Sequence, residues 1–385
     1  MVANVFIEPL DVLHLRGNRL FGEGDGGGGA NMPPWPSVFA GALRSWMLVS
    51  AGEDPVAYGR GNGLAGPLGE VLGTPAAPGS FALTTATLAR LGETGVEPLY
   101  PAPADLEFFA AGDSVSVSRL EPSRLPAGVT SSAAVSHPPI LARAQRDKPL
   151  AGYWLTRRGW ESYLRGGLPH VEDCVARSAL WTLERRLGIA MEASRRRAAE
   201  GLLYTTDAIH LNRHPRTGFL VSIDGLDGMA IAQRGMLRLG GDGRSASVHQ
   251  VESPPPANFD TERLEHSGRF RVVLTSPGLF PDGWRLPGCD RDGVWRFPGG
   301  QARLVSAAVP RAQMVSGWDM ATRPPKPKPA QRVAPTGSVY WFEALEGGLE
   351  GLRKLADQGL WSITADNVNL ARRAEGFNRF VIANA

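Results

Sequence analysis

The fold is decided by residues 5–47, which read VFIEPLDVLHLRGNRLFGEGDGGGGANMPPWPSVFAGALRSWM. The apolar run from Val5 to Leu15 predicts a strand. Three prolines then lead into Ser37, which we predict to be the N-cap of a helix. The apolar residues of that helix are Phe39, Leu43, Trp46 and Met47. A strand is therefore expected to lead into a helix through one long loop.

The loop between this strand and this helix combines arginine with glycine. Arg16 and Arg19 follow the strand, and Gly26–Gly29 follow them. Glycine allows backbone N–H groups to approach a phosphate, and a helix N-terminus adds partial positive charge. The loop is therefore predicted to bind an extended polyanion. The alternative is a long surface loop without a ligand.

The bulk composition sets the class of protein. A chain of 385 residues is too long for one ordinary core, so two domains are expected, and a hydrophobic content of 43% is typical of a globular chain. The net charge of +3 permits nucleic-acid binding only through a local patch. Nearly all basic residues are arginine, which suits bidentate phosphate contacts. A GC-rich genome explains the same bias, and we favour it as the cause.

Several classes of protein are excluded. Cys174 and Cys289 are far apart and lack metal-ligand spacing, which argues against a disulfide scaffold or a zinc site. No signal peptide or membrane span is visible, so we expect a cytoplasmic protein without membrane contact. GxSxG, HExxH and paired-carboxylate motifs are absent, so no catalytic residue, metal site or cofactor is predicted. His14 is the only histidine that we consider as a general base.

The chain alternates between periodic segments and stretches rich in proline and glycine. Residues 52–80 and 98–150 are such stretches, and we interpret them as insertions between core elements. The best linker is ESPPPANFD at 252–260. The predicted domains are therefore 1–255, which holds the insertions, and 256–385.

The second domain has the clearer pattern. We predict a helix or loop at 278–300, a helix at 349–358, and strands at 270–275, 302–315, 338–343 and 376–383. This order matches a ferredoxin-like βαββαβ unit.

The first domain permits the same interpretation, with a strand at 4–15, a helix at 37–50, a hairpin at 187–211 and a strand at 244–251. Further strands are predicted at 81–91 and 218–223, and a helix at 168–186. The predicted fold class is α+β, with two ferredoxin-like (RRM-like, βαββαβ) domains and large loop insertions.

Glycine turns with a basic residue precede two predicted strands. Gly240 and Gly241 stand before Arg244, and Gly376 stands before Arg379. Each turn has two interpretations, a phosphate site and a tight turn with an exposed arginine.

Two basic tips are also candidates for RNA contact: the triplet that contains Arg196, and the group Arg323, Lys326 and Lys328. Projecting tips can straddle a nucleic-acid backbone, whereas most charge runs are solvated surface. Prolines around the two lysines stiffen the second tip, which lowers the entropy lost on binding. The nearby Trp318 is either a core residue or a stacking platform for a base.

Together these residues resemble a known family, the RAMP-superfamily subunit of the type III-B CRISPR effector (the Cmr complex) that caps the 5′ end of the crRNA, in the Cas-five-like group. The matching stretches are IEPLDVLHLRGNRLFGEG, PPWPSVFAGALRS, RLGIAMEASRRRAAEGLLYTTD, LRLGGDGRSA, LTSPGLFPDGW and VPRAQMVSGWDMATRPPKPKPAQRVAPTGSVYWFE. They extend from residue 7 to residue 343, and the run at 309–343 is the most specific.

The resemblance implies two ferredoxin-like domains, no nuclease activity, and binding of the crRNA 5′ tag. It also implies two partner proteins, the large Cas-ten-type polymerase-like subunit and the first backbone RAMP subunit. The family's RNA-binding positions fall on Arg16, Arg19, Ser37, Arg44, Gly240, Gly241, Arg244, Arg311, Arg323, Lys326 and Lys328. Before Arg379, Asn378 replaces a glycine of the family's C-terminal GFG turn, and asparagine tolerates a positive φ.

The predicted function is a non-catalytic RNA-binding subunit of an RNA-guided antiviral complex. One alternative is a metal-independent CRISPR endoribonuclease that uses His14 to process precursor crRNA. Another is a purely architectural subunit that contacts proteins while its neighbours hold the RNA.

Overall fold

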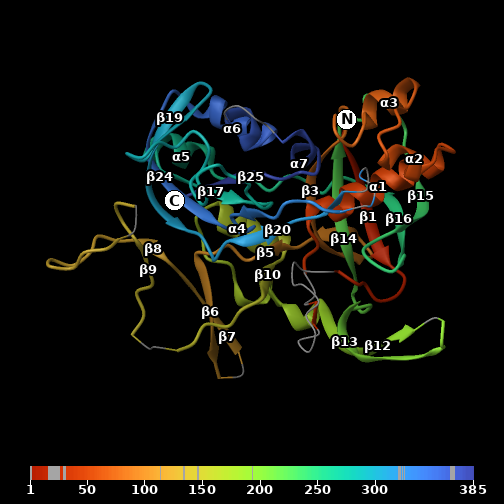
Figure 1. Ribbon diagram of the computed structural model, residues 1–385. Coiled ribbons are helices and arrows are strands. Elements are labelled where there is room, and N and C mark those ends of the chain that lie inside the picture. The colour runs from red at the N-terminus through yellow and green to blue at the C-terminus, as the bar shows by residue number, and fades with distance from the viewer. Residues whose placement is uncertain are drawn as a thin grey trace.

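The computed structural model describes residues 2–15, 27–28, 32–112, 114–132, 135–144, 147–192, 194–319, 322, 324, 326–364 and 369–385. Two antiparallel sheets lie side by side with helices around them (Figure 1). The mixed α and β architecture predicted from the sequence is confirmed. Within the described residues, no helix has the length and apolar character needed to cross a membrane.

The first sheet has the strand order β15-β16-β1-β14-β3-β4. Its strands are β1 (Ala3–Pro9), β3 (Ala82–Gly92), β4 (Gly95–Pro98), β14 (Arg216–Asp224), β15 (Arg234–Arg238) and β16 (Ser245–Val251). Val5 and Ile7 lie on one face of the central strand and share a core with Phe39 and Leu43 of α1 (Pro36–Ser50). The predicted order of a strand and then a helix is thus confirmed, but the strand ends at Pro9 and not at Leu15.

Residues 52–80, which we predicted to be an insertion, contain two short helices, α2 (Pro55–Gly59) and α3 (Gly66–Leu72). Tyr58, Val71 and Leu72 from this segment are buried in the core of the first sheet. The segment therefore belongs to the packed body around α1.

The second sheet has the strand order β18-β19-β24-β17-β25. Its strands are β17 (Phe270–Leu274), β18 (Val294–Phe297), β19 (Gly300–Ala308), β24 (Val339–Glu346) and β25 (Phe380–Asn384). The helix α6 (Leu349–Gln358) matches the predicted helix and buries Leu349, Leu352 and Leu355 against one face of the sheet. Two shorter helices, α5 (Thr261–Ser267) and α7 (Leu370–Ala374), complete this part of the chain.

The other face of the second sheet is covered by residues 100–176, which come from a distant part of the chain. Their elements are β5 (Tyr100–Pro101), β6 (Leu106–Ala111), β7 (Ser114–Arg119), β8 (Glu121–Pro122), β9 (Pro139–Ile140), β10 (Tyr153–Leu155), α4 (Arg157–Leu164) and β11 (Cys174–Ala176). Val273 and Trp341 of the sheet share a core with Leu155 and Trp160 of this segment.

A buried ion pair ties this covering segment to the sheet. Nη1 of Arg271, on β17, donates to Oδ2 of Asp105 at 2.7 Å, and neither side chain has any exposed surface. The hydroxyl of Tyr163 donates to the other carboxylate oxygen at 2.8 Å, and the Tyr163 carbonyl accepts Nη2 of Arg271 at 3.0 Å. Burial raises the pKa of Tyr163, so its hydroxyl remains a neutral donor. These hydrogen bonds offset the desolvation of the two charges.

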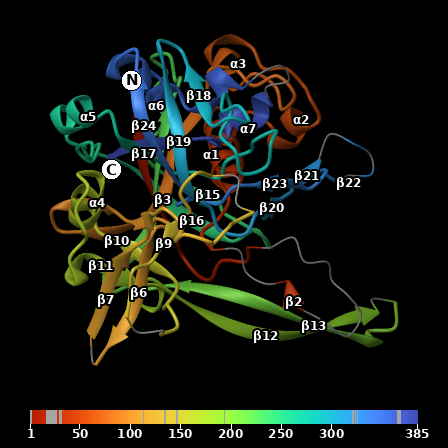
Figure 2. The same cartoon turned by 90° about the vertical axis from the view of Figure 1, so that its left-hand side faces the viewer.

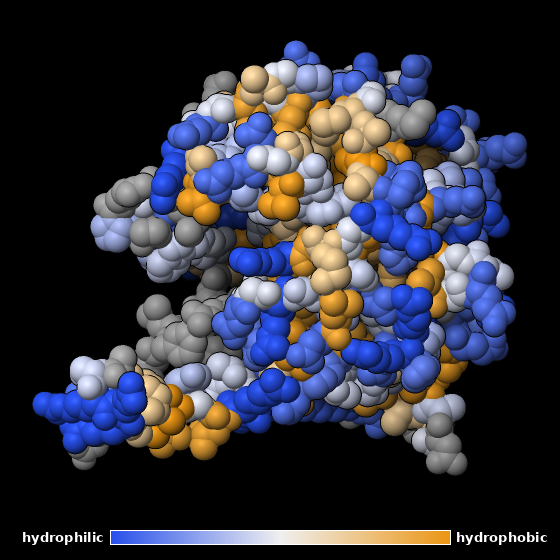
Figure 3. Space-filling view, turned by 90° about the vertical axis from the view of Figure 1, so that its right-hand side faces the viewer, coloured by the Kyte–Doolittle hydropathy of each residue, from blue (hydrophilic) through white to orange (hydrophobic). Residues whose placement is uncertain are grey.

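A long hairpin of β12 (Trp181–Glu192) and β13 (Arg197–Leu211) projects from the body (Figure 2). The short strand β2 (Gly27–Gly28) pairs in parallel with β13. The hairpin exposes an apolar band behind its hydrophilic tip (Figure 3). The exposed apolar residues on it are Leu183, Leu187, Ile189, Met191 and Leu203.

Two predictions for this region are wrong. The helix predicted at 168–186 is replaced by two short 3-10 turns, by β11 and by the start of β12. The hairpin predicted at 187–211 exists, but its strands lie outside the first sheet, where β3 and β14 occupy the places that we assigned to it. Apolar side chains on every second residue from Leu187 onward favour a strand over a helix.

A second ribbon, formed by the described residues of 313–333, lies near α1; we call it the basic ribbon. In it β20 (Gln313–Val315) pairs with β23 (Gln331–Val333), and β21 (Trp318–Asp319) pairs with β22 (Lys326–Pro327). The single strand predicted at 302–315 is thus divided between β19 and β20. Val315 and Val333 pack with Trp361 and Phe377, and Trp35 packs against this cluster from the start of α1. The ribbon therefore bridges the two halves of the molecule.

Candidate nucleic-acid interface

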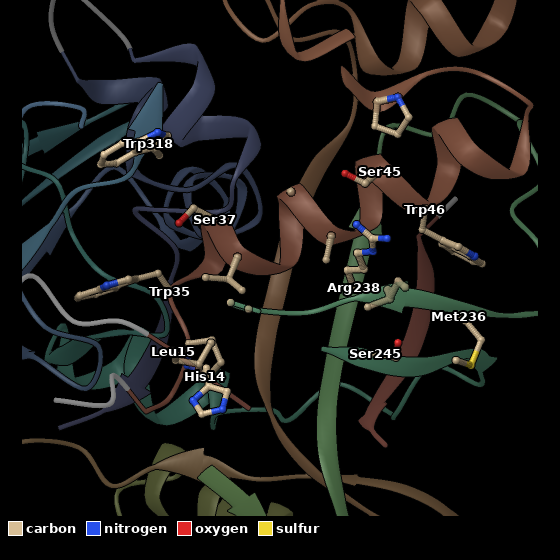
Figure 4. Close-up of a pocket in the computed structure, with 18 of the residues that line it drawn as sticks. His14, Leu15, Trp35, Ser37, Ser45, Trp46, Met236, Arg238, Ser245 and Trp318 are labelled. Atoms are coloured by element: carbon tan, nitrogen blue, oxygen red, sulfur yellow. The ribbon is translucent and has the colours of Figure 1, made fainter. Parts of the chain in front are cut away.

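A groove of about 1100 Å³ lies between α1, β15 and the basic ribbon. Figure 4 shows Trp35 and Trp318 at one end of it and Trp46 and Met236 at the other. Sequence-predicted residues line it at three places, with His14, Ser37 and the pair Gly240–Gly241 in its wall. Its surface is therefore built from segments that are up to about 300 residues apart.

The predicted glycine turn joins β15 to β16 and forms part of the groove wall. Gly240, Asp242 and Gly243 have φ angles of +78°, +56° and +63°. A Cβ atom on Gly240 would lie 2.8 Å from the His14 carbonyl oxygen, so only glycine fits there without a shift of the backbone. The amide of Gly241 donates to that same oxygen at 2.7 Å. The turn is thereby fixed to the segment after β1 that leads into the predicted arginine loop.

The start of α1 differs from our prediction. Trp35, and not Ser37, is the N-cap residue, and no side chain caps the helix. Ser37 lies in the first turn and lines the groove. The N-terminus of α1, which carries partial positive charge, therefore lies at this end of the groove.

The basic side chains near the groove come from two elements. Lys326 and Lys328 are exposed on the basic ribbon, and Arg311 is exposed at the bend before β20. Arg244 follows the glycine turn and donates to Oδ2 of Asp11 at 2.9 Å, so this carboxylate partly neutralises its positive charge. Arg16, Arg19 and Arg323 lie outside the described residues. The described side chains of Arg244, Arg311, Lys326 and Lys328 do not line the groove itself; Arg244 and the two lysines belong to segments that contribute other residues to its wall.

Arg196 is separate from this groove. It lies at the tip of the β12–β13 hairpin with a φ of +49°, and its side chain is exposed. Its neighbours Arg195 and Arg197 both pair with Glu192, at 3.6 and 2.8 Å. Among the described residues Arg196 has no ion-pair partner, so it is the free cation of the tip.

Two other predicted residues, Arg44 and Arg379, are largely buried and do not line the groove. The guanidinium of Arg44 lies 4.9 Å from the centre of the Phe81 ring, and burial lowers its pKa. Nη1 of Arg379 donates to the Asp357 carbonyl at 2.7 Å, and burial lowers the pKa of this residue as well. Both side chains make internal contacts.

The C-terminal turn keeps the shape of a glycine turn. Asn378 has a φ of +63°, as its tolerance of a positive φ predicted. Its side chain accepts the Leu279 amide at 2.6 Å and donates to the Leu279 carbonyl at 3.3 Å. Asn378 is fully buried, so this turn stabilises the core.

Sequence reasoning missed three residues of the groove region. Arg238 lines the groove and is exposed, with no ion-pair partner in the described part of the chain. The alternation of exposed and buried residues along β15 is the signal that could have found it. Trp35 and Arg372 act through contacts between distant segments, which no local pattern reveals.

The chemistry of the groove favours an anion with planar groups. Amide groups, a helix N-terminus and cations suit phosphates, and the exposed indole ring of Trp318 suits a base. No cluster of potential metal ligands occurs among the described residues. Nε2 of His14 lies 4.0 Å from Oδ2 of Asp242, which is an ordinary contact for an imidazole beside a turn.

One family model matches nearly the whole chain. A family model described as CRISPR-associated protein (Cas_Cmr3) matches residues 5–384. No curated protein matches the chain. A chain of the solved "Cryo-EM structure of the Type III-B Cmr-beta bound to cognate target RNA" is 15% identical, with a TM-score of 0.50 and coverage of 98% of this chain and 96% of that chain. A chain of the same complex with target RNA and AMPPnP, state 1, is 16% identical, with a TM-score of 0.49 and coverage of 96% and 91%. The likeness to the first shows a shared fold.

Proposed function

Because the chain belongs to the Cmr3 family of CRISPR-associated proteins, we propose that it is a non-catalytic, RNA-binding subunit of a type III-B Cmr complex that holds the 5′ tag of the crRNA. The observation that carries this proposal is the groove between α1, the glycine turn and the basic ribbon. It joins Ser37, in the first turn of α1, with Gly240 and Gly241, which come from a distant part of the chain. The chain also passes from Leu15, in the groove wall, directly into the arginine loop.

Phosphates of the tag would bind at the polar end of the groove. Backbone amides of the glycine turn and the N-terminus of α1 supply fixed positive dipoles. Arg238 on one side and the ribbon lysines on the other supply mobile charge. Contacts of this kind hold a strand without reading its sequence, and side chains along the groove then contact unstacked bases.

We also propose that both sheets are ferredoxin-like units. In the first sheet the order β16-β1-β14-β3, and in the second the order β25-β17-β24-β19, places the first and third strands in the centre. That order supports a βαββαβ core in each half, with α1 as a helix of the first and α6 as a helix of the second. The boundary near residue 255 then separates two such cores.

Crosslinking tests the placement of the RNA. A crRNA with a photoreactive uridine near its 5′ end is assembled with the full chain and the other Cmr subunits, irradiated and digested. We expect crosslinked peptides that contain the glycine turn or the basic ribbon. Crosslinks that fall only on other subunits would overturn direct capture and favour a purely architectural role.

The basic ribbon provides a second test. Replacing Lys326 and Lys328 together with alanine removes two exposed charges from the side of the groove. For single-stranded RNA the slope of log affinity against log salt changes by about 0.7 for each phosphate that the protein ceases to neutralise, so we expect it to flatten by about 1.4. Arg291→Ala with Lys354→Ala, which removes two exposed charges elsewhere, is the matched control. Equal slopes for the two double variants would show that the ribbon lysines do not bind RNA.

We also retain the two protein partners as part of this proposal, the large Cas-ten-type subunit and the first backbone subunit. The exposed apolar band of the β12–β13 hairpin supports contact with a macromolecule, since such surface is costly to leave in water. Co-purification of tagged chain with each partner separately measures these contacts.

The second candidate function is cleavage of precursor crRNA by His14. The residue lies in the groove wall, with a carboxylate of Asp242 within 4.0 Å. Incubation of the purified chain with repeat RNA in EDTA decides between the two functions. We expect no specific product; a product that disappears in His14→Ala would establish the endoribonuclease instead.

A further inference from the structure

We propose that Trp318 stacks on one unpaired base of the bound RNA strand, and that the buried Arg372 is the positioning residue that holds Trp318 over the groove. The inference rests on the proposed function, because it assigns a role within the same groove.

Trp318 is unusual for its exposure. Its relative exposure is 56%, although its indole ring lies in the wall of the groove. Figure 4 shows it beside Ser37 and opposite Trp35, at the end where the helix begins. A large aromatic ring left in water next to a phosphate-binding end suits the face of a base, which every nucleotide offers.

The neighbours of Trp318 are those of a nucleic-acid contact. Trp318 is paired across the ribbon with Pro327, which stands between Lys326 and Lys328. The amide of Lys328 donates to the Gly317 carbonyl at 2.9 Å, so the cation and the indole are held on adjacent strands. Phosphate attraction and base stacking would therefore act on the same nucleotide segment.

Arg372 fixes the base of this ribbon. Its side chain is 6% exposed and lies over the Phe377 ring at 5.0 Å. Nη2 donates to the Ser316 carbonyl at 3.1 Å, and Nε donates to Oε1 of Gln331 at 3.2 Å. Gln331 belongs to β23, and Ser316 lies on the opposite side of the ribbon, between β20 and β21 and two residues before Trp318.

The third bond of Arg372 completes the arrangement. Nη1 donates to Oε2 of Glu375 at 2.9 Å, immediately after α7, so both strands of the ribbon are tied to one helix of the second half. The guanidinium of arginine is planar and holds its N–H donors in fixed directions, so it can bond the three acceptors at once. The ammonium of lysine cannot reproduce this geometry. Arg372 lies outside the groove lining, so its effect on RNA is indirect.

The experiment uses the full-length chain and a series of tag RNAs that carry 2-aminopurine at one position each. Stacking on an indole quenches this base, and we expect quenching at one position with the wild-type chain. In Trp318→Ala that quenching disappears and binding is weaker by about 5- to 150-fold, the range expected for one stacked base. The slope of affinity against salt stays the same, because no charge is removed.

Variants at and away from the ring separate stacking from other effects. Trp318→Phe keeps an aromatic face and should recover most of the affinity. Leu168→Ala, an exposed apolar residue on a different surface, is the matched control and should bind as the wild type does.

Arg372→Gln should abolish the quenching at the same position with an unchanged salt slope, whereas Arg373→Gln, its exposed neighbour, should not. Gln331→Ala removes the acceptor of the hydrogen bond from Nε of Arg372, at a less buried residue. This variant therefore still tests the positioning role if Arg372→Gln fails to fold. It should reduce the quenching at that position.

The outcomes distinguish the two proposals. If wild-type chain binds the tag but Trp318→Ala binds and quenches equally well, the stacking role is wrong and the proposed function stands. If wild-type chain binds no tag RNA at all, the proposed function is wrong and this inference is overturned with it.

Discussion

Replacing Asp105 with alanine is expected to lower the free energy of unfolding by about 3–5 kcal/mol, the usual cost of leaving a buried charge without its partner. The guanidinium of Arg271 would lose its carboxylate in a site with no exposed surface. The Tyr163 hydroxyl would lose its acceptor as well. Urea denaturation of the full chain measures this change.

Two comparisons make the Asp105 result interpretable. Asp147→Ala breaks an exposed pair with Arg143, at 3.1 Å, and should cost about 1 kcal/mol or less. The double variant Asp105→Leu with Arg271→Met removes both charges and should be more stable than Asp105→Ala alone. A loss of under about 1 kcal/mol for Asp105→Ala would contradict a structural role for the pair.

Replacing Arg16 and Arg19 together with alanine is expected to weaken tag binding by roughly 100-fold, as for the removal of two charge-assisted hydrogen bonds. Arg16 directly follows Leu15, which lines the groove, and Arg19 stands three residues after Arg16. With two fewer phosphates neutralised, the salt dependence should also flatten, by about 1.4 in slope. Titration of labelled tag RNA at several salt concentrations measures both quantities.

The control for the arginine loop is again Arg291→Ala with Lys354→Ala, which changes the net charge equally at exposed sites outside the groove lining. That variant should keep its salt slope. If the loop variant matches the control in affinity and slope, the first loop does not bind the RNA. A loss of affinity without a change in slope would indicate a structural role for the loop.

Local sequence patterns predicted the elements whose signals are themselves local. The strand at Val5, the helix α1 and the turn at Gly240 all follow from apolar periodicity, proline and glycine within a few residues. The helix α6 has regular apolar spacing and was predicted with its observed bounds. Positive φ at Asn378 follows from a property of asparagine alone.

Long-range pairing was not predictable in the same way. The strands at 81–91 and 218–223 were predicted, but their pairing in the centre of the first sheet was not, because β3 and β14 are separated by the whole covering segment and the hairpin. The helix predicted at 168–186 was wrong because Val171, Val175 and Leu183 fit a helical spacing by chance, whereas the chain there forms two 3-10 turns, β11 and the start of β12.

The candidate site likewise combines residues that local patterns predict with residues that only the folded structure brings together. Ser37 and Gly240 were selected from motifs, and the structure brings them to one groove. Arg44 was selected from the resemblance and Arg379 from its glycine turn, but both are largely buried and contribute to internal packing. The alternation along β15 could have indicated Arg238, whereas Trp35 emerges only once α1 and the basic ribbon are placed together.

The covering of the second sheet by residues 100–176 has a practical consequence for dissecting this molecule. A fragment that begins at residue 256 would expose Val273, Val305 and Trp341 to water. It would also leave the charge of Arg271 within an apolar surface and without its partner Asp105. Such a fragment should aggregate when expressed alone. Supplying residues 98–180 as a separate polypeptide should restore its solubility, since complementation restores the missing layer.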